Sequence, residues 1–187
     1  MGIGMGDRAD DARFEAAVLP HLDAAYNLAR WLTRDEHAAE DLVQEAYLRA
    51  LKFFGGFRGG DGKAWILAIV RNACFDWLKL RRAEDLHDAF DENIHSPDMD
   101  CPARLTDNAA VNPEASAARR ATAESIRDAL EHLPAEYREA LVLRELEGLS
   151  YKEIASVAEV PIGTIMSRLA RARKQLRKQL RLEREES

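Results

Sequence analysis

Basic side chains collect at one end of this 187-residue sequence. Between Gly163 and Arg184 the one acid is Glu183, and it stands against eight bases: Arg168, Arg171, Arg173, Lys174, Arg177, Lys178, Arg181 and Arg184. The chain as a whole carries a formal net charge of -6, so the basic end is a local feature. Cations concentrated in this way favour binding of a polyanion, while the acidic remainder discourages indiscriminate binding.

Histidine and cysteine, which most often bind metals or act as nucleophiles, form no constellation in the sequence. The five histidines are scattered, at His21, His37, His87, His95 and His132. His95 and Cys101 lie in a polar segment and make a poor metal site. Cys74 lies within a helical pattern and is expected to be a small core residue. We therefore expect no catalytic residue, metal or cofactor, and the two cysteines suit a reducing compartment.

The elements around the basic end predict a helix-turn-helix. Ser150 and Glu153 have the spacing of a capping box, which predicts a short helix that begins at Tyr151. Leu149 and Ile154 fit the hydrophobic staple around that box. The letters "EVPIG" then interrupt the short helix, and a longer helix follows, so that the pair has the form of a helix-turn-helix.

The longer helix, which starts around Ile162, has two different faces. Its apolar stripe is Ile165, Leu169, Ala172, Leu176 and Leu180. The opposite face carries Ser167, Ala170, Arg171, Lys174 and Lys178, with Met166 and Arg168 at the edges. Small residues let a backbone approach a groove, and arginines reach phosphates and guanine edges, so this face favours entry into the DNA major groove. The alternative is a solvated basic helix within a bundle.

The N-terminal part predicts a compact helical bundle, roughly from Arg13 to Arg82. "FEAAVLPHLDAAYNLARWL" is typical of an amphipathic helix interrupted near Pro20, and "KAWILAIVRNACFDWLKLRR" of a long helix that follows a glycine-rich connection. Between them "DLVQEAYLRALKFF" predicts a helix, and "TRDE", Thr33 to Glu36, has the form of its capping box. One face of that helix is apolar, with Leu42, Ala46, Ala50 and Phe53 or Phe54. Largely away from it lie Asp41, Gln44, Glu45, Leu48 and Lys52.

The stretch that follows the bundle lacks helical periodicity. From Glu84 to Glu114 acids far outnumber the single base Arg104, and the segment contains Pro97, Pro102 and Pro113, so it predicts a flexible acidic linker. Helical pattern then resumes, with Pro134 suited to a first turn and Gly148 to a left-handed cap. The expected fold is all-α, with two small helical domains joined by the linker. The expected division is a disordered N-terminus over 1–12, a first domain over 13–83, the linker over 84–121 and a second domain over 122–184.

No segment of the sequence predicts contact with a membrane. The longest apolar run, "AWILAIV", is too short to span a bilayer. The first residues carry early acids and no apolar stretch, so we expect no signal peptide. The sequence therefore indicates a cytoplasmic protein without membrane insertion.

Taken in order, these segments resemble a bacterial extracytoplasmic-function (ECF) sigma factor of the sigma-70 family, in its compact two-domain form. The resemblance rests on "DLVQEAYLRALKFF", "FRGGDGKAWILAIVRNACFDWLKLRR" and "LPAEYREALVLRELEGLSYKEIASVAEVPIGTIMSRLARAR", and covers about Phe14 to Arg82 and Glu124 to Leu180. A helix-turn-helix alone is shared with many repressors, whereas two motif-bearing domains in this order are specific. The resemblance implies a sigma-2-like and a sigma-4-like domain and promoter-specific transcription initiation, with no catalysis by this chain and control by an anti-sigma factor.

The resemblance also implies where core RNA polymerase binds. The helix "DLVQEAYLRA" is expected to bind the clamp helices of the largest polymerase subunit, and the polymerase flap region is a further expected contact of the chain. The residues expected at the clamp helices are Asp41, Gln44, Glu45 and Leu48. Carboxylate and amide groups there can pair with basic and polar groups of a partner, whereas periodicity alone slightly favours an ordinary exposed helix face.

The long helix and the loop before it resemble the element that reads the -10 region of promoter DNA. Catching an unpaired strand calls for aromatic walls, an amide for base edges and cations along the strand. The expected contacts are Phe57, Arg58, Lys63, Trp65, Arg71, Asn72, Lys79, Arg81 and Arg82. At least two of Trp65, Phe75 and Trp77 are expected to be core residues. Asn72 is the sharper candidate, because it aligns with a family position that lines the pocket for a flipped base.

In the second domain, the resemblance implies contacts with the -35 element of promoter DNA. The expected residues are Thr164, Met166, Ser167, Arg168, Arg171 and Lys174. Many family members carry Arg or Lys where this chain has Met166, and a larger residue where it has Ala170. The -35 sequence therefore cannot be copied from a relative.

Two other classes of protein stay open at this stage. One is a two-domain transcriptional regulator, whose helical N-terminal domain senses a ligand or dimerises and whose helix-turn-helix binds duplex DNA alone. The other, an enzyme, has no candidate constellation. A sigma factor comigrates with core RNA polymerase and starts transcripts, whereas a regulator binds DNA without polymerase.

Overall fold

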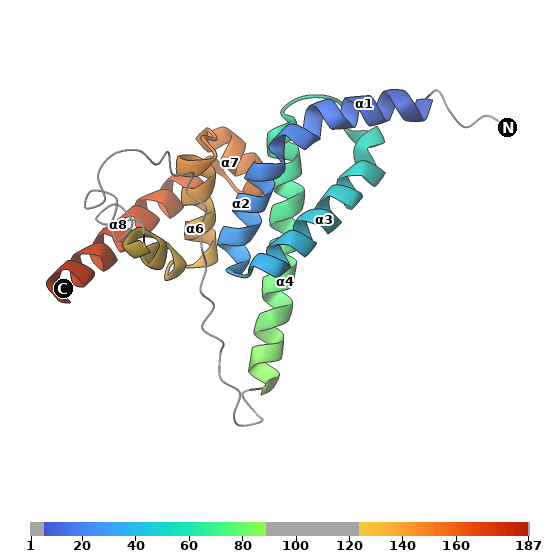
Figure 1. Ribbon diagram of the computed structural model, residues 1–187. Coiled ribbons are helices and arrows are strands. Elements are labelled where there is room, and N and C mark those ends of the chain that lie inside the picture. Colours follow the sequence, from blue (N-terminus) through green and yellow to red (C-terminus); the bar gives the residue numbers. More distant parts are fainter. Residues whose placement is uncertain (1–5, 89–123, 187) are drawn as a thin grey trace, which may run out of the picture.

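The structure is a computed structural model and describes residues 6–88 and 124–186, all of whose regular elements are helical. The expected linker therefore lies mostly outside the described residues. The N-terminal domain contains α1 (Gly6–Val18), η1 (Leu19–His21), α2 (Leu22–Thr33), α3 (Glu36–Phe53), η2 (Phe54–Gly56) and α4 (Gly62–Asp88). The C-terminal domain contains a helical segment at 124–131, then α6 (Ala135–Leu141), η3 (Val142–Leu146), α7 (Tyr151–Ala158) and α8 (Ile162–Glu186). Figure 1 shows both domains.

The expected interruption at Pro20 is confirmed. Here α1 ends at Val18, the 3-10 turn η1 contains Pro20, and α2 begins at Leu22. α1 differs from expectation at its start, because it is helical from Gly6 where disorder was expected through residue 12. α4 likewise continues to Asp88, beyond the expected end of the first domain.

The capping box predicted at "TRDE" is wrong. Thr33 is the last residue of α2, and its hydroxyl hydrogen bonds to the carbonyl oxygen of Ala29 at 2.9 Å. The N-cap of α3 is Asp35, whose Oδ1 accepts from the backbone N–H of Ala38 at 3.0 Å. Arg34 between them is left-handed, with a φ of 60°, and the N-cap lies two residues later than the predicted box requires.

The apolar stripe of α3 is confirmed, and the structure selects one of its two terminal phenylalanines. Leu42, Ala46 and Ala50 are buried, and Phe54 is buried with them, whereas Phe53 is 59% exposed. Phe54 packs edge-on against Phe14 of α1, with ring centroids 5.3 Å apart. The contact between Phe14 and Phe54 therefore packs α1 against η2, which directly follows α3.

The predicted helix-turn-helix is confirmed element by element. Ser150 caps α7, and both hydrogen bonds of the capping box with Glu153 are formed. Gly148 has a φ of 71°, the left-handed conformation expected of it, and η3 before it is a π-helical turn. α8 begins at Ile162, and its predicted stripe is buried at Ile165, Leu169 and Ala172.

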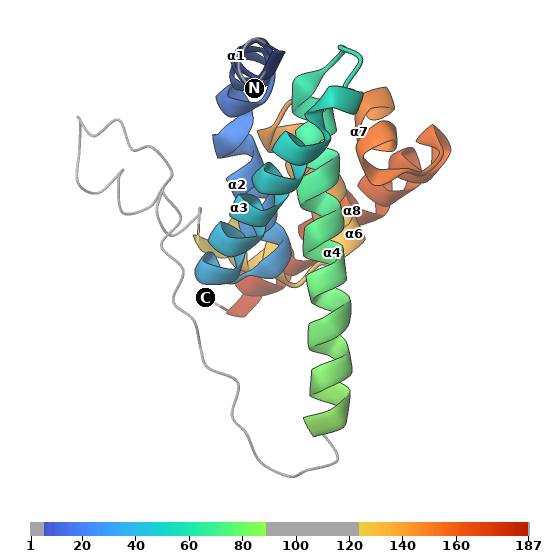
Figure 2. The same cartoon turned by 90° about the vertical axis from the view of Figure 1, so that its right-hand side faces the viewer.

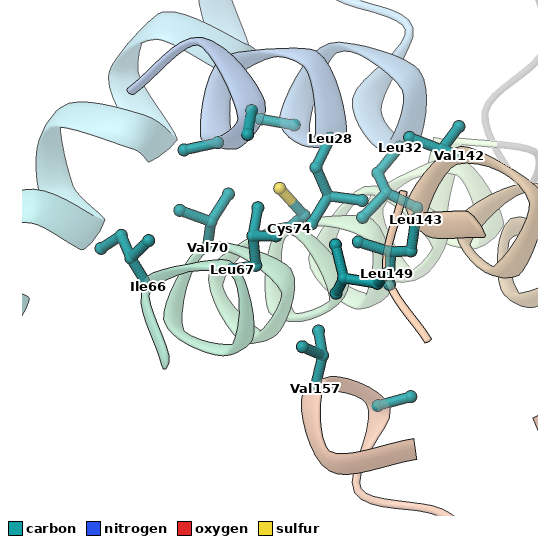
Figure 3. Close-up of a cluster of buried hydrophobic side chains, with 14 of the residues drawn as sticks. Leu28, Leu32, Ile66, Leu67, Val70, Cys74, Val142, Leu143, Leu149 and Val157 are labelled. Atoms are coloured by element: carbon teal, nitrogen blue, oxygen red, sulfur yellow. The ribbon is translucent and has the colours of Figure 1, made fainter. Parts of the chain in front are cut away.

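The two domains pack directly against each other. α4 contacts α7 of the second domain, and α2 contacts α6. Figure 2 shows α4 between α3 and α7, and both views show the C-terminal end of α4 projecting beyond the other helices (Figures 1 and 2). The buried side chains form one hydrophobic cluster, in which Leu28 and Leu32 of α2 and Leu67 of α4 meet Leu143 and Leu149 of the second domain (Figure 3). The sequence predicts each domain but not this contact.

Candidate polymerase and nucleic-acid interfaces

The outward face of α3 is polar with an apolar edge. Asp41, Gln44, Glu45 and Leu48, the residues expected at polymerase, are all exposed, and Leu48 is 69% exposed. Glu45 forms a salt bridge with Arg49 one turn later, with 2.6 Å between Oε1 and Nη2, which orients the Glu45 carboxylate on the helix surface. Such a face can bind a partner through carboxylates around an apolar anchor.

Leu51 extends this face, and it is not among the polymerase-binding residues expected from the sequence. It lies three residues after Leu48, and the two are therefore neighbours on the helix surface. Leu51 is also exposed. The available signal was a large apolar residue that falls outside the stripe of Leu42, Ala46 and Ala50.

The outer face of α8 presents the predicted basic surface. Met166, Ser167, Arg171 and Lys174 are exposed, and Thr164 is half-buried. The hydroxyl of Ser167 donates to the carbonyl oxygen of Thr164 at 2.8 Å. Arg171 donates from Nη1 to the Tyr137 hydroxyl of α6 at 3.4 Å, which gives its long side chain a preferred direction.

Arg168 differs from the other predicted residues of α8, because it turns inward. Its side chain is 19% exposed, and Nη1 lies 3.6 Å from Oε2 of Glu139 on α6. In this arrangement Arg168 helps to hold α8 against α6. Its position at the edge of the two faces is consistent with this placement.

The loop before α4 is built on an aromatic cluster. Phe57 stacks on Phe54 with ring centroids 5.4 Å apart, and its ring lies 4.9 Å from that of Trp65. Phe57 and Trp65 are both half-buried and pack against the core, so each keeps part of its surface accessible. Phe75 and Trp77 are also partly buried and pack against the core. The expectation that at least two of Trp65, Phe75 and Trp77 are core residues is met only in part, since all three pack against the core but none is fully buried.

Four of the predicted cations near the -10 candidates are exposed: Arg58, Lys79, Arg81 and Arg82. Arg58 precedes Gly59 and Gly60, whose φ values of 85° and 117° keep the loop tight. Lys79 pairs with Asp76 at 3.0 Å, and Arg81 lies over the Trp77 ring at 5.2 Å. Lys79, Arg81 and Arg82 lie in the C-terminal half of α4. Cations and an aromatic ring thus line an accessible helix, as single-strand binding requires.

Glu139 is a buried carboxylate between the two domains. It is 1% exposed, and its Oε1 accepts from Nε of Arg71 on α4 at 2.6 Å. Its other oxygen is the one that faces Arg168 at 3.6 Å. Burial raises the pKa of Glu139, against the lowering effect of the Arg71 charge and hydrogen bond and of the Arg168 charge. Arg71 in turn donates to the side-chain oxygen of Asn72 at 3.0 Å and lies over the Phe75 ring.

Glu147 makes a second ionic contact between the domains. Its Oε2 lies 2.9 Å from Nζ of Lys63 at the start of α4, and the same ammonium donates to the Glu147 backbone carbonyl at 2.8 Å. Asn27 of α2 donates to Oε1 at 3.4 Å. The Glu147 side chain is only 7% exposed. The ionic partners of Glu139 and Glu147 cannot be predicted from local sequence, since they lie 68 and 84 positions away along the chain.

Arg138 makes a third polar contact across the domain boundary. Its Nη1 donates to the carbonyl oxygens of Glu131 and Leu133, at 2.9 and 3.0 Å, and its Nη2 donates to that of Leu32 in α2 at 3.3 Å. Burial lowers the pKa of Arg138 to about 10, so it remains a cation at neutral pH. A single buried guanidinium thus satisfies carbonyls in both domains.

Cys74 is a buried core thiol, as expected. Burial raises its pKa to about 12, with a smaller contribution from Glu139, so the thiolate is scarcely populated at neutral pH. The other cysteine, Cys101, and His95 lie outside the described residues. Within the ranges that the structure describes, no group of three His, Cys, Asp or Glu side chains is placed to hold a metal ion. None of the helices described there is long and apolar enough to cross a membrane.

Comparison with known proteins connects both domains to one family. Residues 17–84 match Sigma-70 region 2, and residues 123–176 match Sigma-70, region 4. These two regions in this order define a two-domain protein of the sigma-70 class.

Similar proteins indicate which group of sigma-70 proteins this chain resembles. The chain is 33% identical over 172 residues to ECF RNA polymerase sigma factor SigE of Mycolicibacterium smegmatis, covering 92% of this chain but 63% of SigE. It is 33% identical over 184 residues to RNA polymerase sigma-H factor of Pseudomonas aeruginosa, covering 92% of this chain and 89% of that relative. The chain belongs to the ECF sigma factors of the sigma-70 family.

Solved structures agree with this family at the level of the fold. The sigma factor RpoE of Bartonella quintana, in a co-crystal with the anti-sigma factor NepR, matches with a TM-score of 0.69 and 29% identity, over 90% of this chain and 97% of RpoE. CnrH, solved with the cytosolic domain of CnrY, matches with a TM-score of 0.60 at 23% identity, over 95% of this chain and 99% of CnrH. The likeness to CnrH extends to the fold alone.

Proposed function

We propose that this chain directs core RNA polymerase to promoters, reads their -10 and -35 elements, and performs no catalysis itself. The observation that carries the proposal is the combination of three surfaces on one chain: the polar and apolar outer face of α3, the cations and aromatics around α4, and the basic outer face of α8. Each is exposed at least in part, and each has the chemistry that its proposed partner needs. Family membership supports the assignment of all three.

The surface of α3 is proposed to dock on the clamp helices of the largest polymerase subunit. Asp41, Gln44 and Glu45 offer acceptors and an amide, and Leu48 with Leu51 offers an apolar anchor. Exposed apolar residues beside carboxylates are more readily explained by a partner than by the fold, since the core of the domain is formed on the other side of α3. The second domain is proposed to contact the polymerase flap region.

The two DNA-reading surfaces are proposed to lie in different domains. Residues 13–83 read the melted -10 strand, with Asn72 at the flipped base and the cations of α4 along the strand. Residues 122–184 read duplex -35 DNA through α8, with Arg171 and Lys174 as exposed cations. Arg168 points inward and position 166 is a methionine, so neither offers an outward cation for DNA. We therefore propose that Arg171 contributes a larger share of the -35 contacts here than it would in a helix with cations at all three positions.

Control by an anti-sigma factor is part of the proposal, as is a cytoplasmic location beside polymerase. Support comes from the matched RpoE structure, which is of a complex with the anti-sigma factor NepR. An anti-sigma factor that covered α3 would keep the chain from polymerase. The test is co-expression with the products of neighbouring genes, followed by transcription assay; if none of them lowers transcription, this part of the proposal fails.

The test of the function combines purified chain with core polymerase. We expect comigration in size-exclusion chromatography and site-selective transcripts from a genomic library, whose mapped starts share two upstream elements. A regulator would instead bind duplex DNA without polymerase, typically as a dimer on a palindrome. Binding to DNA with no association with polymerase would replace the proposed function by that alternative.

A further inference from the structure

Two arginines in the first half of α8 face carboxylates of their own domain. Nη1 of Arg168 lies 3.6 Å from the buried carboxylate of Glu139, and Nη2 of Arg173 lies 2.8 Å from that of Glu145. A carboxylate offsets the charge of its arginine and occupies N–H groups that could otherwise bind DNA. A phosphate or a guanine edge must therefore compete with Glu139 or Glu145 for these two side chains.

The arginine between them, Arg171, has a neutral partner. Its Nη1 donates to the hydroxyl of Tyr137 on α6 at 3.4 Å. A hydroxyl accepts this hydrogen bond without bringing a negative charge, so the full charge of Arg171 stays available for DNA. Arg171 is also exposed on the outer face of α8, where DNA can approach it.

Tyr137 can set the direction of Arg171 because its own ring is held in place. The side chain is half-buried and packs against the core, while the hydroxyl reaches α8. This is the usual division of tyrosine into an apolar body and a polar tip. A long arginine side chain loses rotamer freedom when it binds DNA, and a partner that limits this freedom beforehand lowers that cost.

We propose that Tyr137 is a positioning residue for -35 recognition, which orients Arg171 toward a base edge without neutralising its charge. The inference rests on the proposed function, because it takes Arg171 as a -35 contact. The direction of Arg171 matters more in this chain because position 166 is a methionine and Arg168 points inward. Tyr137 acts through Arg171, so its hydroxyl makes the reading more selective and adds little to the binding of other DNA.

The first experiment removes only the hydroxyl. Tyr137→Phe keeps the ring, and the matched control is Tyr26→Phe, because Tyr26 donates its hydroxyl to Glu36 at 3.3 Å within the other domain. Each protein, assembled with core polymerase, is titrated against a fluorescent promoter duplex whose mapped -35 element is either intact or scrambled. Anisotropy gives the ratio of the Kd for the scrambled duplex to the Kd for the intact one.

Tyr137→Phe should lower this discrimination ratio about threefold to tenfold, chiefly through weaker binding to the intact element. Tyr26→Phe should stay within about twofold of wild type, since its hydroxyl lies outside the proposed -35 surface. An unchanged ratio for Tyr137→Phe, or equal losses in the two variants, would refute the positioning role.

A double-mutant cycle shows whether Tyr137 acts through Arg171. In an Arg171→Ala background, Tyr137→Phe should change the discrimination ratio by less than about twofold, because the side chain that it orients is gone. If Tyr137→Phe lowers the ratio as much in that background as in the wild type, the hydroxyl acts independently of Arg171 and the inference is wrong.

The orientation itself is measurable without DNA or polymerase. NMR relaxation of isotope-labelled arginine Nε groups in the free full-length chain reports the fast motion of each guanidinium, and Arg171→Lys assigns the Arg171 signal. Arg171 should have a higher order parameter than Arg177, an exposed arginine of the same helix, and should lose this difference in Tyr137→Phe. No difference in the wild type, or one that survives Tyr137→Phe, overturns the inference.

Failure of the function is distinguishable from failure of the positioning role. If the wild-type chain with core polymerase does not discriminate the intact from the scrambled -35 element, the proposed -35 reading fails. If the wild type discriminates and Tyr137→Phe discriminates equally well, the function stands and the positioning role is rejected.

Discussion

Arg138 shows how a single buried cation can stabilise the closed molecule. Its guanidinium donates to three carbonyl oxygens, those of Glu131, Leu133 and Leu32. A charged donor is suited to this role, since hydrogen bonds from charged groups are stronger than those between neutral groups. The sequence offers no sign of it, because Arg138 stands among several charged residues in "EYREALVLRELE".

We expect Arg138→Ala to lower the free energy of unfolding by about 2–4 kcal/mol, because carbonyl groups of both domains lose their donor. Urea denaturation followed by circular dichroism measures it. The control is Arg49→Ala, which removes an exposed pair with Glu45 and should cost less than about 0.5 kcal/mol. Similar losses for the two variants would contradict the structural role of Arg138.

Cys74 should be inert toward alkylation in the folded chain. Its thiol is fully buried and its pKa is raised to about 12, so both access and thiolate are lacking. In a Cys101→Ser background, iodoacetamide at pH 8 should modify Cys74 at least about a hundredfold more slowly in the folded chain than in urea. Comparable rates would mean that the core around α4 opens readily.

At the scale of elements, helix boundaries and buried faces were predicted correctly where they depend on residues close together in the sequence. The capping box of Ser150 and Glu153 and the stripe of α8 involve residues within a few turns, and both are confirmed. The box at Thr33 failed because "TRDE" offers two N-cap candidates, and the choice of Asp35 depends on where α2 ends. The ambiguity between Phe53 and Phe54 likewise depended on Phe14, which is distant in sequence.

The cap of α7 should matter for the helix-turn-helix. We expect Ser150→Ala to lower the free energy of unfolding by about 1 kcal/mol, because the backbone N–H of Glu153 loses its acceptor. Ser150→Asp supplies another acceptor and should restore most of the loss in thermal denaturation. An equal loss in both variants would show that the hydroxyl does not act as a cap.

Gly62 marks a close approach between α1 and α4. A Cβ at this position would overlap the backbone carbonyl of Ala17, whereas a Cβ at Gly163, in the first turn of α8, meets open space. We expect Gly62→Ala to destabilise the chain by about 1–3 kcal/mol, because backbone must move. Gly163→Ala should be neutral or stabilising by up to about 1 kcal/mol. Thermal denaturation compares them, and a neutral Gly62→Ala would contradict the packing of α1 on α4.

At the scale of the whole molecule, the sequence could supply the two domains but not their contact. The types of Lys63, Arg71 and Arg168 suggested nucleic-acid binding, yet all three face carboxylates here. One sequence carries no pairwise signal for residues so far apart. The structure adds an arrangement in which cations that we propose as DNA contacts pair with carboxylates of the second domain.

The central claim is that two surfaces, in separate domains, read two elements of one promoter. Its most direct measurement is run-off transcription with core polymerase on a mapped promoter and on versions altered at either the -10 or the -35 element. The proteins are wild type, Asn72→Ala, Arg171→Ala and, as a control, Arg177→Ala, an exposed arginine of α8 outside the proposed site.

We predict that Asn72→Ala loses discrimination against -10 changes alone. Arg171→Ala should lose about 1–3 kcal/mol of -35 discrimination if it contacts a base, and Arg177→Ala should behave as wild type. If Asn72→Ala and Arg171→Ala keep wild-type preferences at both elements, or lose the same element, the account of two separate reading surfaces is contradicted.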